Sequence, residues 1–255
     1  MGSMRDIDPY TVLAAGYDFV MEHVDYEAWA DYIHELITTH HDSPDKLAEL
    51  GCGTGSLAVA LHRYGYTDYL ATDVSNAMLD VARRKAETTN AGIRFAQADF
   101  SSFRLLQPVD VLLLLYDGMN YLLGVDKLQG LFTSAYDALK SGGIFVVDQS
   151  TPSNSLQNEP YFEDQGEKGG FSYRRRSRYD SDSYLHTTTI EISVGDDTFR
   201  ETHVQKAYTM QEIERLILEA GFDILSAYDG FSLDDAHENS ERIHWVLRRP
   251  PSVSR

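Results

Sequence analysis

The sequence predicts an α/β protein in which a doubly wound, mainly parallel sheet is interrupted by an inserted antiparallel β meander. Two observations carry this prediction. From residue 46 to about residue 150, short apolar segments alternate with segments of helical periodicity, which is the rhythm of a parallel sheet with helices on both faces. From about residue 151 to residue 206 three segments alternate at period two instead, with turn residues between them.

Five strands and three helices are expected in the regular part of the chain. The run from Val109 to Tyr116 is apolar throughout, as expected for a strand that is buried on both faces. Ser75 stands where it can cap a helix that starts at Asn76, and Ser141-Gly142-Gly143 stands where the last of these helices ends. The expected strands are residues 47–50, 66–72, 93–97, 109–116 and 144–148, and the expected helices are residues 57–64, 76–88 and 127–139.

The remaining segments complete the predicted fold. Inserted strands are expected at residues 171–179, 184–194 and 198–206, and no helix is expected between residues 151 and 206. Helical spacing returns at residues 210–220, which Gly221 ends, and two last strands follow at residues 223–228 and 242–248. We therefore expect one domain at residues 4–150 and 207–250, with an inserted subdomain at residues 151–206.

Charge and cysteine content exclude several classes of partner. The formal net charge of the 255-residue chain is -18, and so acidic a surface repels the phosphates of nucleic acids and of anionic membranes. We therefore expect neither as a partner, and the longest apolar run is far too short to cross a bilayer. Cys52 is the single cysteine, which rules out an internal disulfide and favours the reducing cytoplasm. Both a monomer and a homodimer fit the sequence.

The turn after the first predicted strand of the sheet is rich in glycine and reads Gly51-x-Gly53-x-Gly55. Glycines let a backbone approach a ligand closely, and the helix that follows presents unpaired N–H groups, so a doubly wound sheet binds a nucleotide at this place. Ser56 stands where a dinucleotide-binding turn has its last glycine, so that fingerprint is incomplete. Alone, the turn is a weak indication, because many such turns only reverse the chain.

Two acids follow the next two strands. Asp73 stands at the end of the second strand, where a carboxylate can accept both ribose hydroxyls of an adenosine. Asp99 follows the third strand, where it can accept the adenine amino group while Phe100 covers the ring face. Either acid alone is as easily a helix cap or a loop acid. Their placement after consecutive parallel strands favours an adenosine-containing ligand.

These residues belong to an ordered set of motifs that resembles class I S-adenosylmethionine-dependent methyltransferases. The set comprises Glu49-Leu50-Gly51-Cys52-Gly53-Thr54-Gly55, Thr72-Asp73-Val74-Ser75-x-x-Met78-Leu79, Gln97-Ala98-Asp99-Phe100 and Leu139-Lys140-x-Gly142-Gly143. The resemblance covers residues 10–150 and 207–249, and it implies a three-layer α/β/α fold whose seven-stranded sheet has an antiparallel last strand. It also implies that S-adenosylmethionine is bound by Gly51, Cys52, Gly53, Gly55, Asp73, Val74, Met78, Asp99 and Phe100.

A closer resemblance is to bacterial small-molecule methyltransferases with a β insert and to glycine N-methyltransferase. It rests on Tyr17-Asp18, on Tyr26-Glu27-Ala28-Trp29 in a segment of helical spacing, and on Tyr116-Asp117-x-x-Asn120-Tyr121-Leu122. By this resemblance Tyr17 and Trp29 close over the methionine end of the cofactor, and Tyr116 lines its pocket. Trp29 is otherwise a plain core residue of an amphipathic helix, and the same alternative stays open for Tyr17.

The expected reaction is methyl transfer to a small molecule, and the resemblance favours nitrogen over oxygen as the acceptor atom. The acceptor is expected between residues 117–121 and the inserted strands, with Asp117 and Tyr121 as the catalytic residues. An amine needs only its neutral form, whereas a hydroxyl usually needs a base or a metal. Asp117 and Asp148 stand where some O-methyltransferases hold a metal, but Gln149 departs from the usual Asp-Asn pair, so no metal is expected.

Two other functions stay open. A nicotinamide-dependent oxidoreductase has a similar sheet, although Ser56 argues against it, and a non-catalytic S-adenosylmethionine-binding protein would have a damaged acceptor pocket. On the first inserted strand, alternate arginines either bind an acidic substrate group or, as we favour, pair with acids of the insert; they are Arg174, Arg176 and Arg178. The isolated histidines are interpreted as surface or structural residues rather than as bases; they are His186, His203 and His237.

Overall fold

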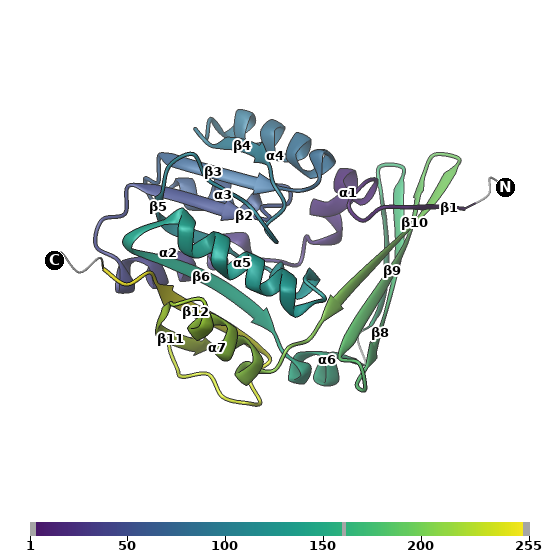
Figure 1. Ribbon diagram of the computed structural model, residues 1–255. Helices are drawn as coiled ribbons and strands as arrows, with labels where there is room; N and C mark the ends of the chain where they lie inside the picture. Colours follow the sequence, from purple (N-terminus) through teal and green to yellow (C-terminus); the bar gives the residue numbers. More distant parts are fainter. Residues whose placement is uncertain (1–3, 160–161, 252–255) are drawn as a thin grey trace.

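Two β-sheets organise the molecule, which a computed structural model describes over residues 4–159 and 162–251. Within those residues the larger sheet has seven strands, in the order β11-β12-β6-β5-β2-β3-β4 (Figure 1). Strands β2 to β6 pair in parallel, whereas β12 is antiparallel to β6 and β11, so the predicted sheet with an antiparallel last strand is confirmed. The strands are β2 (Lys46–Leu50), β3 (Asp68–Asp73), β4 (Arg94–Gln97), β5 (Val109–Leu114), β6 (Leu139–Ser150), β11 (Asp223–Asp229) and β12 (Arg242–Arg248).

Helices cover both faces of this sheet, which confirms the predicted three-layer fold. On one face, Leu47 of β2 and Val111 of β5 belong to a core that is shared with α2 (Tyr26–His40), α3 (Ser56–His62) and α4 (Asn76–Thr89). On the other face, Ala48 and Leu112 belong to a core that is shared with α5 (Val125–Ala138) and α7 (Met210–Glu219). Successive residues of a strand point to opposite faces, so neighbouring positions enter two separate cores.

Local capping explains where two of the helices begin and end. Ser75 caps α4 as predicted, because its Oγ accepts a hydrogen bond from the backbone N–H of Met78 at 3.3 Å. Thr209 and Glu212 form a reciprocal capping box at the start of α7. Gly221 follows the end of α7 with a φ of +90°, which a glycine adopts without strain.

The inserted strands form a second sheet of five strands in the described part of the chain, ordered β1-β10-β9-β8-β7. The three predicted strands are confirmed as the antiparallel meander β8 (Phe171–Asp180), β9 (Leu185–Val194) and β10 (Asp197–Lys206). Two edge strands were not predicted. The polar strand β7 (Glu163–Lys168) lacks apolar alternation, and β1 (Arg5–Ile7) is a three-residue strand that pairs in parallel with β10. An N-terminal segment thus joins a sheet that is built by residues far along the chain.

The prediction was wrong in three places: it missed two helices, and it placed the start of one strand too late. The short helix α6 (Pro152–Asn158) lies where no helix was expected; Thr151 caps it, and a proline stands in its first turn. The helix α1 (Leu13–Val20) has eight residues, which is too short for a clear periodic signal. β6 already begins at Leu139 and includes Ser141-Gly142-Gly143, because the backbone of these glycines bonds with that of Arg249.

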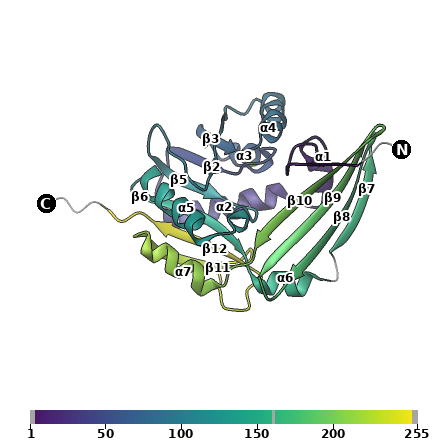
Figure 2. The ribbon, with the colours of Figure 1, turned by 45° about the vertical axis from the view of Figure 1, so that its right-hand side comes forward.

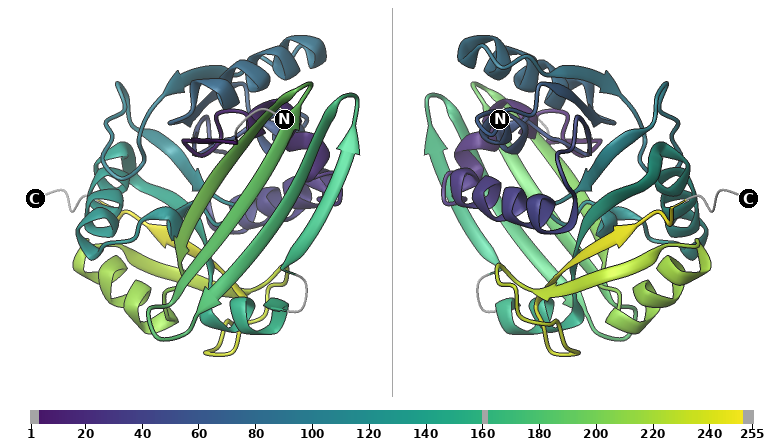
Figure 3. Two further views of the ribbon diagram at one scale, coloured as in Figure 1. Left: turned by 90° about the vertical axis from the view of Figure 1, so that its right-hand side faces the viewer. Right: turned by 90° about the vertical axis from the view of Figure 1, so that its left-hand side faces the viewer.

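The second sheet stands beside the carboxyl end of β6, where Ser150 and residues of the inserted strands line one cavity. Figure 2 shows this sheet curving away from the larger one, and the left view of Figure 3 shows it face on. Helix α1 packs against both α4 and the second sheet; Gly16 permits this, since a Cβ there would lie 2.3 Å from the ring of Phe171. No helix in the described ranges combines the length and apolar character that crossing a bilayer requires.

Candidate active site

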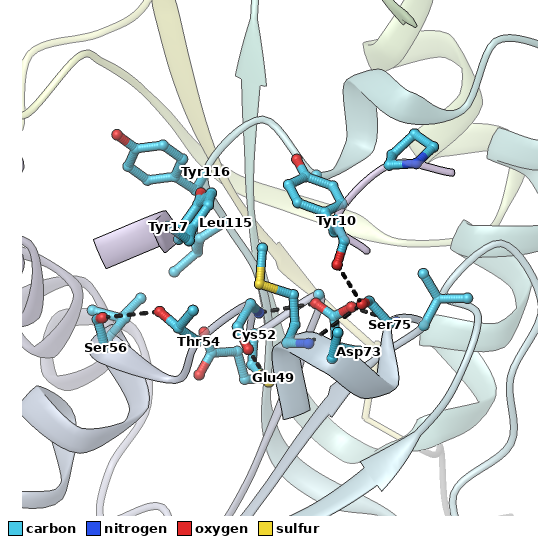
Figure 4. Close-up of a pocket in the computed structure, with 18 of the residues that line it drawn as sticks. Tyr10, Tyr17, Glu49, Cys52, Thr54, Ser56, Asp73, Ser75, Leu115 and Tyr116 are labelled. Carbon is cyan, nitrogen blue, oxygen red and sulfur yellow. Dashed lines mark hydrogen bonds between the residues drawn. The ribbon is translucent and has the colours of Figure 1, made fainter. Parts of the chain in front are cut away.

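A cavity of about 650 Å³, which we name the turn cavity, opens at the carboxyl ends of β2, β3 and β5. The glycine turn and the residues after β3 form one side of it, and aromatic residues form another (Figure 4). Gly55 and Asp99 are absent from its lining. The predicted cofactor-binding residues that do line it are Tyr17, Trp29, Gly51, Cys52, Gly53, Asp73, Val74, Met78, Phe100 and Tyr116.

The glycine turn adopts a backbone shape that favours glycine. Gly51, Gly53 and Gly55 have φ angles of +61°, +55° and +72°. A Cβ on Gly53 would meet nothing within 4 Å, so the backbone there is open to a ligand. A Cβ on Gly55 would lie 3.0 Å from the Cβ of Ala82, so Gly55 serves the packing of α3 against α4. Gly53 and Gly55 therefore have different tasks.

Asp73 ties the glycine turn to the start of α4. Its Oδ2 accepts a hydrogen bond from the N–H of Gly53 at 2.9 Å, and its Oδ1 accepts one from the N–H of Ser75 at 2.8 Å. Burial raises the pKa of this carboxyl, and the backbone N–H groups offset part of the rise. Each carboxylate oxygen has further acceptor capacity, so Asp73 can also accept hydroxyl groups of a ligand.

Asp99 stands at the rim rather than in the wall. Its side chain is exposed, and its Oδ1 accepts a hydrogen bond from the N–H of Ser101 at 2.8 Å. The next residue, Phe100, does line the turn cavity and lies against Gly51. The adenine contact expected of Asp99 stays a prediction.

Glu49 is a buried acid of the turn cavity, and the sequence pointed to it only as part of the glycine motif. Its side chain accepts a hydrogen bond from the hydroxyl of Tyr69 at 2.8 Å, and the residue is 4% exposed. Burial raises the pKa of Glu49 to about 7, although the Tyr69 hydrogen bond acts in the opposite direction. A positively charged ligand in the turn cavity would stabilise the ionised form of this carboxyl.

A second cavity of about 290 Å³, which we name the insert cavity, lies between the end of β6 and the inserted sheet. Both cavities are lined by the same four tyrosines, Tyr10, Tyr17, Tyr116 and Tyr121. Figure 4 shows the first three of them across the turn cavity from the glycine turn. The insert cavity is otherwise rich in neutral hydrogen-bonding side chains, namely Asn120, Asn154, Ser155, Ser177, Thr188 and Gln205.

After β5 the backbone is strained at Tyr116 and Asp117, and ion pairs of Arg242 with Asp117 and Asp148 hold it in place. Tyr116 and Asp117 have φ angles of +64° and +60°, a region that costs non-glycine residues about 1–3 kcal/mol each. The N–H of Asp117 donates to Oδ1 of Asp148 at 3.0 Å, and Nη1 of Arg242 lies 2.7 Å from Oδ1 of Asp117 while also pairing with Asp148. Asp117, the predicted catalytic acid, is therefore held in an ion pair, and a guanidinium stands between the two acids considered for a metal.

Trp29 contributes to the core and to the turn cavity at once. It is 8% exposed and lies in the core beside α3, yet its side chain also reaches the cavity wall. Its ring centroid lies 5.3 Å from that of Tyr116, and the guanidinium of Arg242 lies 5.6 Å from the centroid of the Trp29 ring. The rings of Trp29 and Tyr116 thus pack close to the guanidinium of Arg242, which forms the ion pair with Asp117.

Behind Tyr121 lies a buried polar chain that the sequence did not predict. The hydroxyl of Tyr121 lies 2.5 Å from that of Tyr10 and 3.0 Å from Nδ1 of His203. Nε2 of His203 lies 3.4 Å from Oε2 of Glu201. The interpretation of His203 as a surface or structural residue omitted its place in the wall of the insert cavity. The available signal was the period-two spacing of Glu201 and His203 in a predicted strand.

The arginines of β8 divide between the two faces of the inserted sheet. Arg174 and Arg176 lie 3.9 Å and 3.7 Å from the carboxylate of Glu163, with which the sequence interpretation would pair them. Arg175 points to the insert cavity instead, and its guanidinium binds Asp164 at 2.7 Å and 2.9 Å. The alternate arginines therefore lie outside the cavity, and the intervening one is already paired.

The glycine turn and the residues after it match a known domain. Residues 47–143 match the family model described as a methyltransferase domain. An S-adenosylmethionine-dependent methyltransferase of Clostridium acetobutylicum has a solved structure that is 25% identical, with a TM-score of 0.80 over 94% of this chain and 99% of that chain. This chain is a class I S-adenosylmethionine-dependent methyltransferase.

One further relative agrees with this assignment, and one further solved structure shares the fold. A putative methyltransferase of Geobacillus sp. (strain WCH70) is 25% identical over 246 residues, which cover 94% of this methyltransferase and 99% of the relative. A sugar N-methyltransferase of a Streptoalloteichus species shares the fold, with 18% identity and a TM-score of 0.70 over 98% of this chain and 95% of that chain. These relatives do not favour the nicotinamide-dependent or the non-catalytic alternative. The likeness to glycine N-methyltransferase stays a prediction.

S-adenosylmethionine is the cofactor of this methyltransferase, and the turn cavity fits it. The open backbone at Gly53 permits close approach, and Asp73 offers acceptor oxygens for ribose hydroxyls. The buried carboxyl of Glu49 suits a ligand that carries a positive sulfur. The contacts expected with the cofactor have three chemical origins, which is why a glycine turn alone was a weak indication.

Proposed function

We propose that this methyltransferase transfers a methyl group to a nitrogen of a small molecule that binds in the insert cavity. The observation that carries the proposal is the tyrosine wall common to the turn cavity and the insert cavity, because donor and acceptor must meet in line. S-adenosylmethionine supplies a methyl group on a positively charged sulfur. The protein aligns the two ligands and excludes water from between them.

The size and the charge of the insert cavity support a small polar acceptor. Its volume of about 290 Å³ is at the lower end of the usual range for small-ligand pockets. Arg175 and Asp117 are neutralised by Asp164 and Arg242, and the ammonium of Lys206 lies 4.9 Å from the ring centroid of Tyr208. The other hydrogen-bonding groups of the lining are mainly hydroxyls and amides. That lining favours a compact acceptor with several hydrogen-bonding groups.

The protonation states around the cavity support nitrogen as the nucleophile. Burial raises the pKa of Tyr17 and of Tyr121, so both stay protonated at neutral pH and do not act as phenolate bases. Asp117 is committed to Arg242. A hydroxyl acceptor would need a strong base, whereas an amine attacks in its neutral form. We propose that Tyr121 and Asp117 contact the amine, the first through its hydroxyl and the second through its carboxylate.

The test is transfer of labelled methyl from S-adenosylmethionine to a fractionated bacterial small-molecule extract, with identification of the product by mass and fragmentation. Thr188→Trp fills the insert cavity, whereas Thr187→Trp, on the neighbouring residue of β9, points to a groove on the outer face. We expect Thr188→Trp to block transfer while it keeps its affinity for S-adenosylhomocysteine. Thr187→Trp should transfer methyl groups as the wild type does.

Three results would contradict the proposal. A product methylated on oxygen would overturn the choice of nitrogen. Methylation of protein or nucleic acid instead of a small molecule would overturn the acceptor class. Full transfer by Thr188→Trp, with binding of S-adenosylhomocysteine intact, would place the acceptor outside the insert cavity.

A further inference from the structure

Tyr121 connects the tyrosine wall to a buried histidine and carboxylate. It belongs to the short helix η1 (Met119–Tyr121), and its hydroxyl bonds with Nδ1 of His203 on β10 at 3.0 Å. His203 and Glu201 are 4% and 0% exposed. Groups so buried are normally paired, and here the pairs form one continuous chain from Tyr10 to Glu201.

The surroundings of Glu201 decide its charge. Its Oε1 accepts hydrogen bonds from the backbone N–H groups of Val12 and Leu13 at 2.8 Å and 2.9 Å. Its Oε2 accepts one from the backbone N–H of Tyr10 at 2.7 Å. Burial alone would raise the pKa of Glu201, but the nearby imidazole of His203 and the hydrogen bonds from these backbone groups outweigh it and lower the pKa. Glu201 is therefore ionised at neutral pH.

An ionised Glu201 selects the tautomer of His203. A carboxylate that faces Nε2 favours the proton on that nitrogen, which leaves Nδ1 with a free lone pair. Nδ1 faces the hydroxyl of Tyr121 at 3.0 Å, so it accepts the Tyr121 proton in this hydrogen bond. Since Tyr121 gives its one proton to Nδ1, the hydroxyl of Tyr10 donates across the 2.5 Å between the two oxygens. The oxygen of Tyr121 then keeps its second lone pair, toward the two cavities that it lines.

We propose that Tyr121 and His203 form a relay that removes a proton from the acceptor amine, with Glu201 holding the imidazole in the receiving tautomer. The inference rests on the proposed function, because it takes the acceptor to be an amine that arrives as an ammonium ion. His203 acts through Tyr121 and is a positioning and proton-holding residue rather than a group that touches the acceptor.

The proton transfer balances without any further reactant. An N–H bond of the ammonium breaks, and its proton moves to the oxygen of Tyr121 while the hydroxyl proton of Tyr121 moves to Nδ1 of His203. The nitrogen keeps the electron pair, Tyr121 is neutral before and after, and the imidazolium faces the carboxylate of Glu201. The relay suits an amine far better than a hydroxyl, because an ammonium ion is a much stronger acid than an alcohol and gives up its proton to a neutral base.

Several titratable groups surround this relay. On β10 itself Glu201 is the partner of His203, and across β9 the residue opposite His203 is Thr188, which does not titrate. The ring of Tyr10 lies with its centroid 4.7 Å from that of His203. The other titratable groups that share the insert cavity with Tyr121 are Tyr17, Tyr116, Asp117, Arg175, His186 and Lys206. Those that share only the turn cavity with it are Asp8, Tyr26, Glu49, Cys52 and Asp73.

A variant at Glu201 does not distinguish the relay from a purely structural role. Glu201 also caps the start of α1 through Val12 and Leu13, so a variant at Glu201 would disturb that helix whatever His203 does. The decisive measurements therefore concern His203 and Tyr121.

The first test needs no acceptor. We would record nitrogen NMR spectra of protein with ¹⁵N-labelled histidine, loaded with S-adenosylhomocysteine, across pH 5 to 9. We expect His203 as the Nε2–H tautomer at high pH, with protonation at Nδ1 on acidification. Tyr121→Phe should move the Nδ1 resonance toward that of an unbonded nitrogen. An Nδ1–H tautomer at high pH would overturn the relay, because that nitrogen could not then receive a proton.

The second test is the pH profile of labelled methyl transfer to the small-molecule extract. His203→Gln should lower the rate about 100-fold near pH 7, the lower range for a general base, and the deficit should shrink toward pH 9 as free amine accumulates. Tyr121→Phe should behave in the same way. His237→Gln is the matched control, since that histidine is exposed and lies outside both cavities.

The outcomes separate this inference from the proposed function. Transfer to an amine with an unchanged pH profile in His203→Gln would overturn the relay and leave the function standing. Wild-type protein that binds S-adenosylhomocysteine but methylates no amine would overturn the function, and the tautomer of His203 would still decide the relay. If His203→Gln does not fold, the wild-type spectra decide alone.

Discussion

The turn cavity and the insert cavity share four tyrosines but are built in different ways. Most of the glycine-turn side comes from residues 49–57 and 73–78, which are two βα connections close together in the chain. The insert cavity takes its walls from α1, η1, α6 and three inserted strands, which span residues 10–207. The glycine-turn side of the turn cavity is therefore nearly local in sequence, whereas the walls of the insert cavity depend on long-range packing.

Asn120 illustrates how the insert cavity depends on contacts between distant segments. Its amide nitrogen donates to the carbonyl oxygens of Ser150 and Lys206 at 2.8 Å and 2.7 Å, and its oxygen accepts from the N–H of Ser150 at 3.0 Å. One buried side chain thus joins the end of β6 to the end of β10. The hydrogen bonds by which Asp73 holds Gly53 and Ser75 join residues only 20 and 2 positions apart.

The largest effect is expected on the insert-cavity side, from Arg242→Met. Loss of the guanidinium leaves the carboxylates of Asp117 and Asp148 without their cation, so the free energy of unfolding should fall by about 3–5 kcal/mol. Burial already raises the pKa of Asp148, and loss of the nearby cation raises it further, so the deficit should grow from pH 5 to pH 8. Denaturant unfolding measures this, and Arg248→Met, in an exposed ion pair, is the control. Equal deficits at both pH values would refute the charge argument.

Asp73→Ala tests the turn cavity by itself. The change removes the acceptor for two backbone N–H groups and the expected contact with ribose, so affinity for S-adenosylhomocysteine should fall about 100-fold, or about 3 kcal/mol. Isothermal titration calorimetry measures it. Asn154→Ala, in the insert cavity, should bind as the wild type does. If Asn154→Ala weakened binding as much as Asp73→Ala, the separation of the two cavities would be wrong.

Glu49→Gln probes the buried acid of the turn cavity through pH. Because the folded pKa is raised to about 7, wild-type stability is greatest below the ordinary pKa near 4.5 and is lost as the pH rises toward 7. The neutral amide does not titrate, so its stability relative to the wild type should increase by up to about 3 kcal/mol between pH 4.5 and pH 7.5. Unfolding in denaturant at both pH values tests this, with the exposed Glu87→Gln as control. A difference that is flat with pH would mean that Glu49 stays ionised throughout.

The smallest effect is expected from Asp99→Ala. Its carboxylate is exposed at the rim, and a hydrogen bond to adenine there would compete with water, so its loss should weaken cofactor binding by at most about tenfold. Isothermal titration calorimetry with S-adenosylhomocysteine measures the affinity of Asp99→Ala, which is then compared with that of Asp73→Ala. A loss as large as that of Asp73→Ala would show that Asp99 turns into the cavity when the cofactor binds.

The sequence predicted the sheet, its helices and most of the turn cavity, because those features leave local signals. The apolar run of β5, the cap at Ser75 and the spacing of glycines in the turn each depend on neighbours within a few residues. It missed β1, since three residues carry no periodicity, and β7, since a polar edge strand has no apolar face. It also passed over His203, since a histidine's role depends on what its ring nitrogens contact.

By itself, then, the sequence determined the α/β fold, the glycine turn and Asp73, and with them the methyl donor. Only the tertiary structure decided that Gly55 serves helix packing, that Arg242 pairs with Asp117, and that Tyr10 and Tyr121 meet His203. The physical reason is the range of the interactions. Turns, caps and strand patterns are set by adjacent residues, whereas burial, ion pairs and hydrogen-bond chains arise where segments that are as many as 191 residues apart come together.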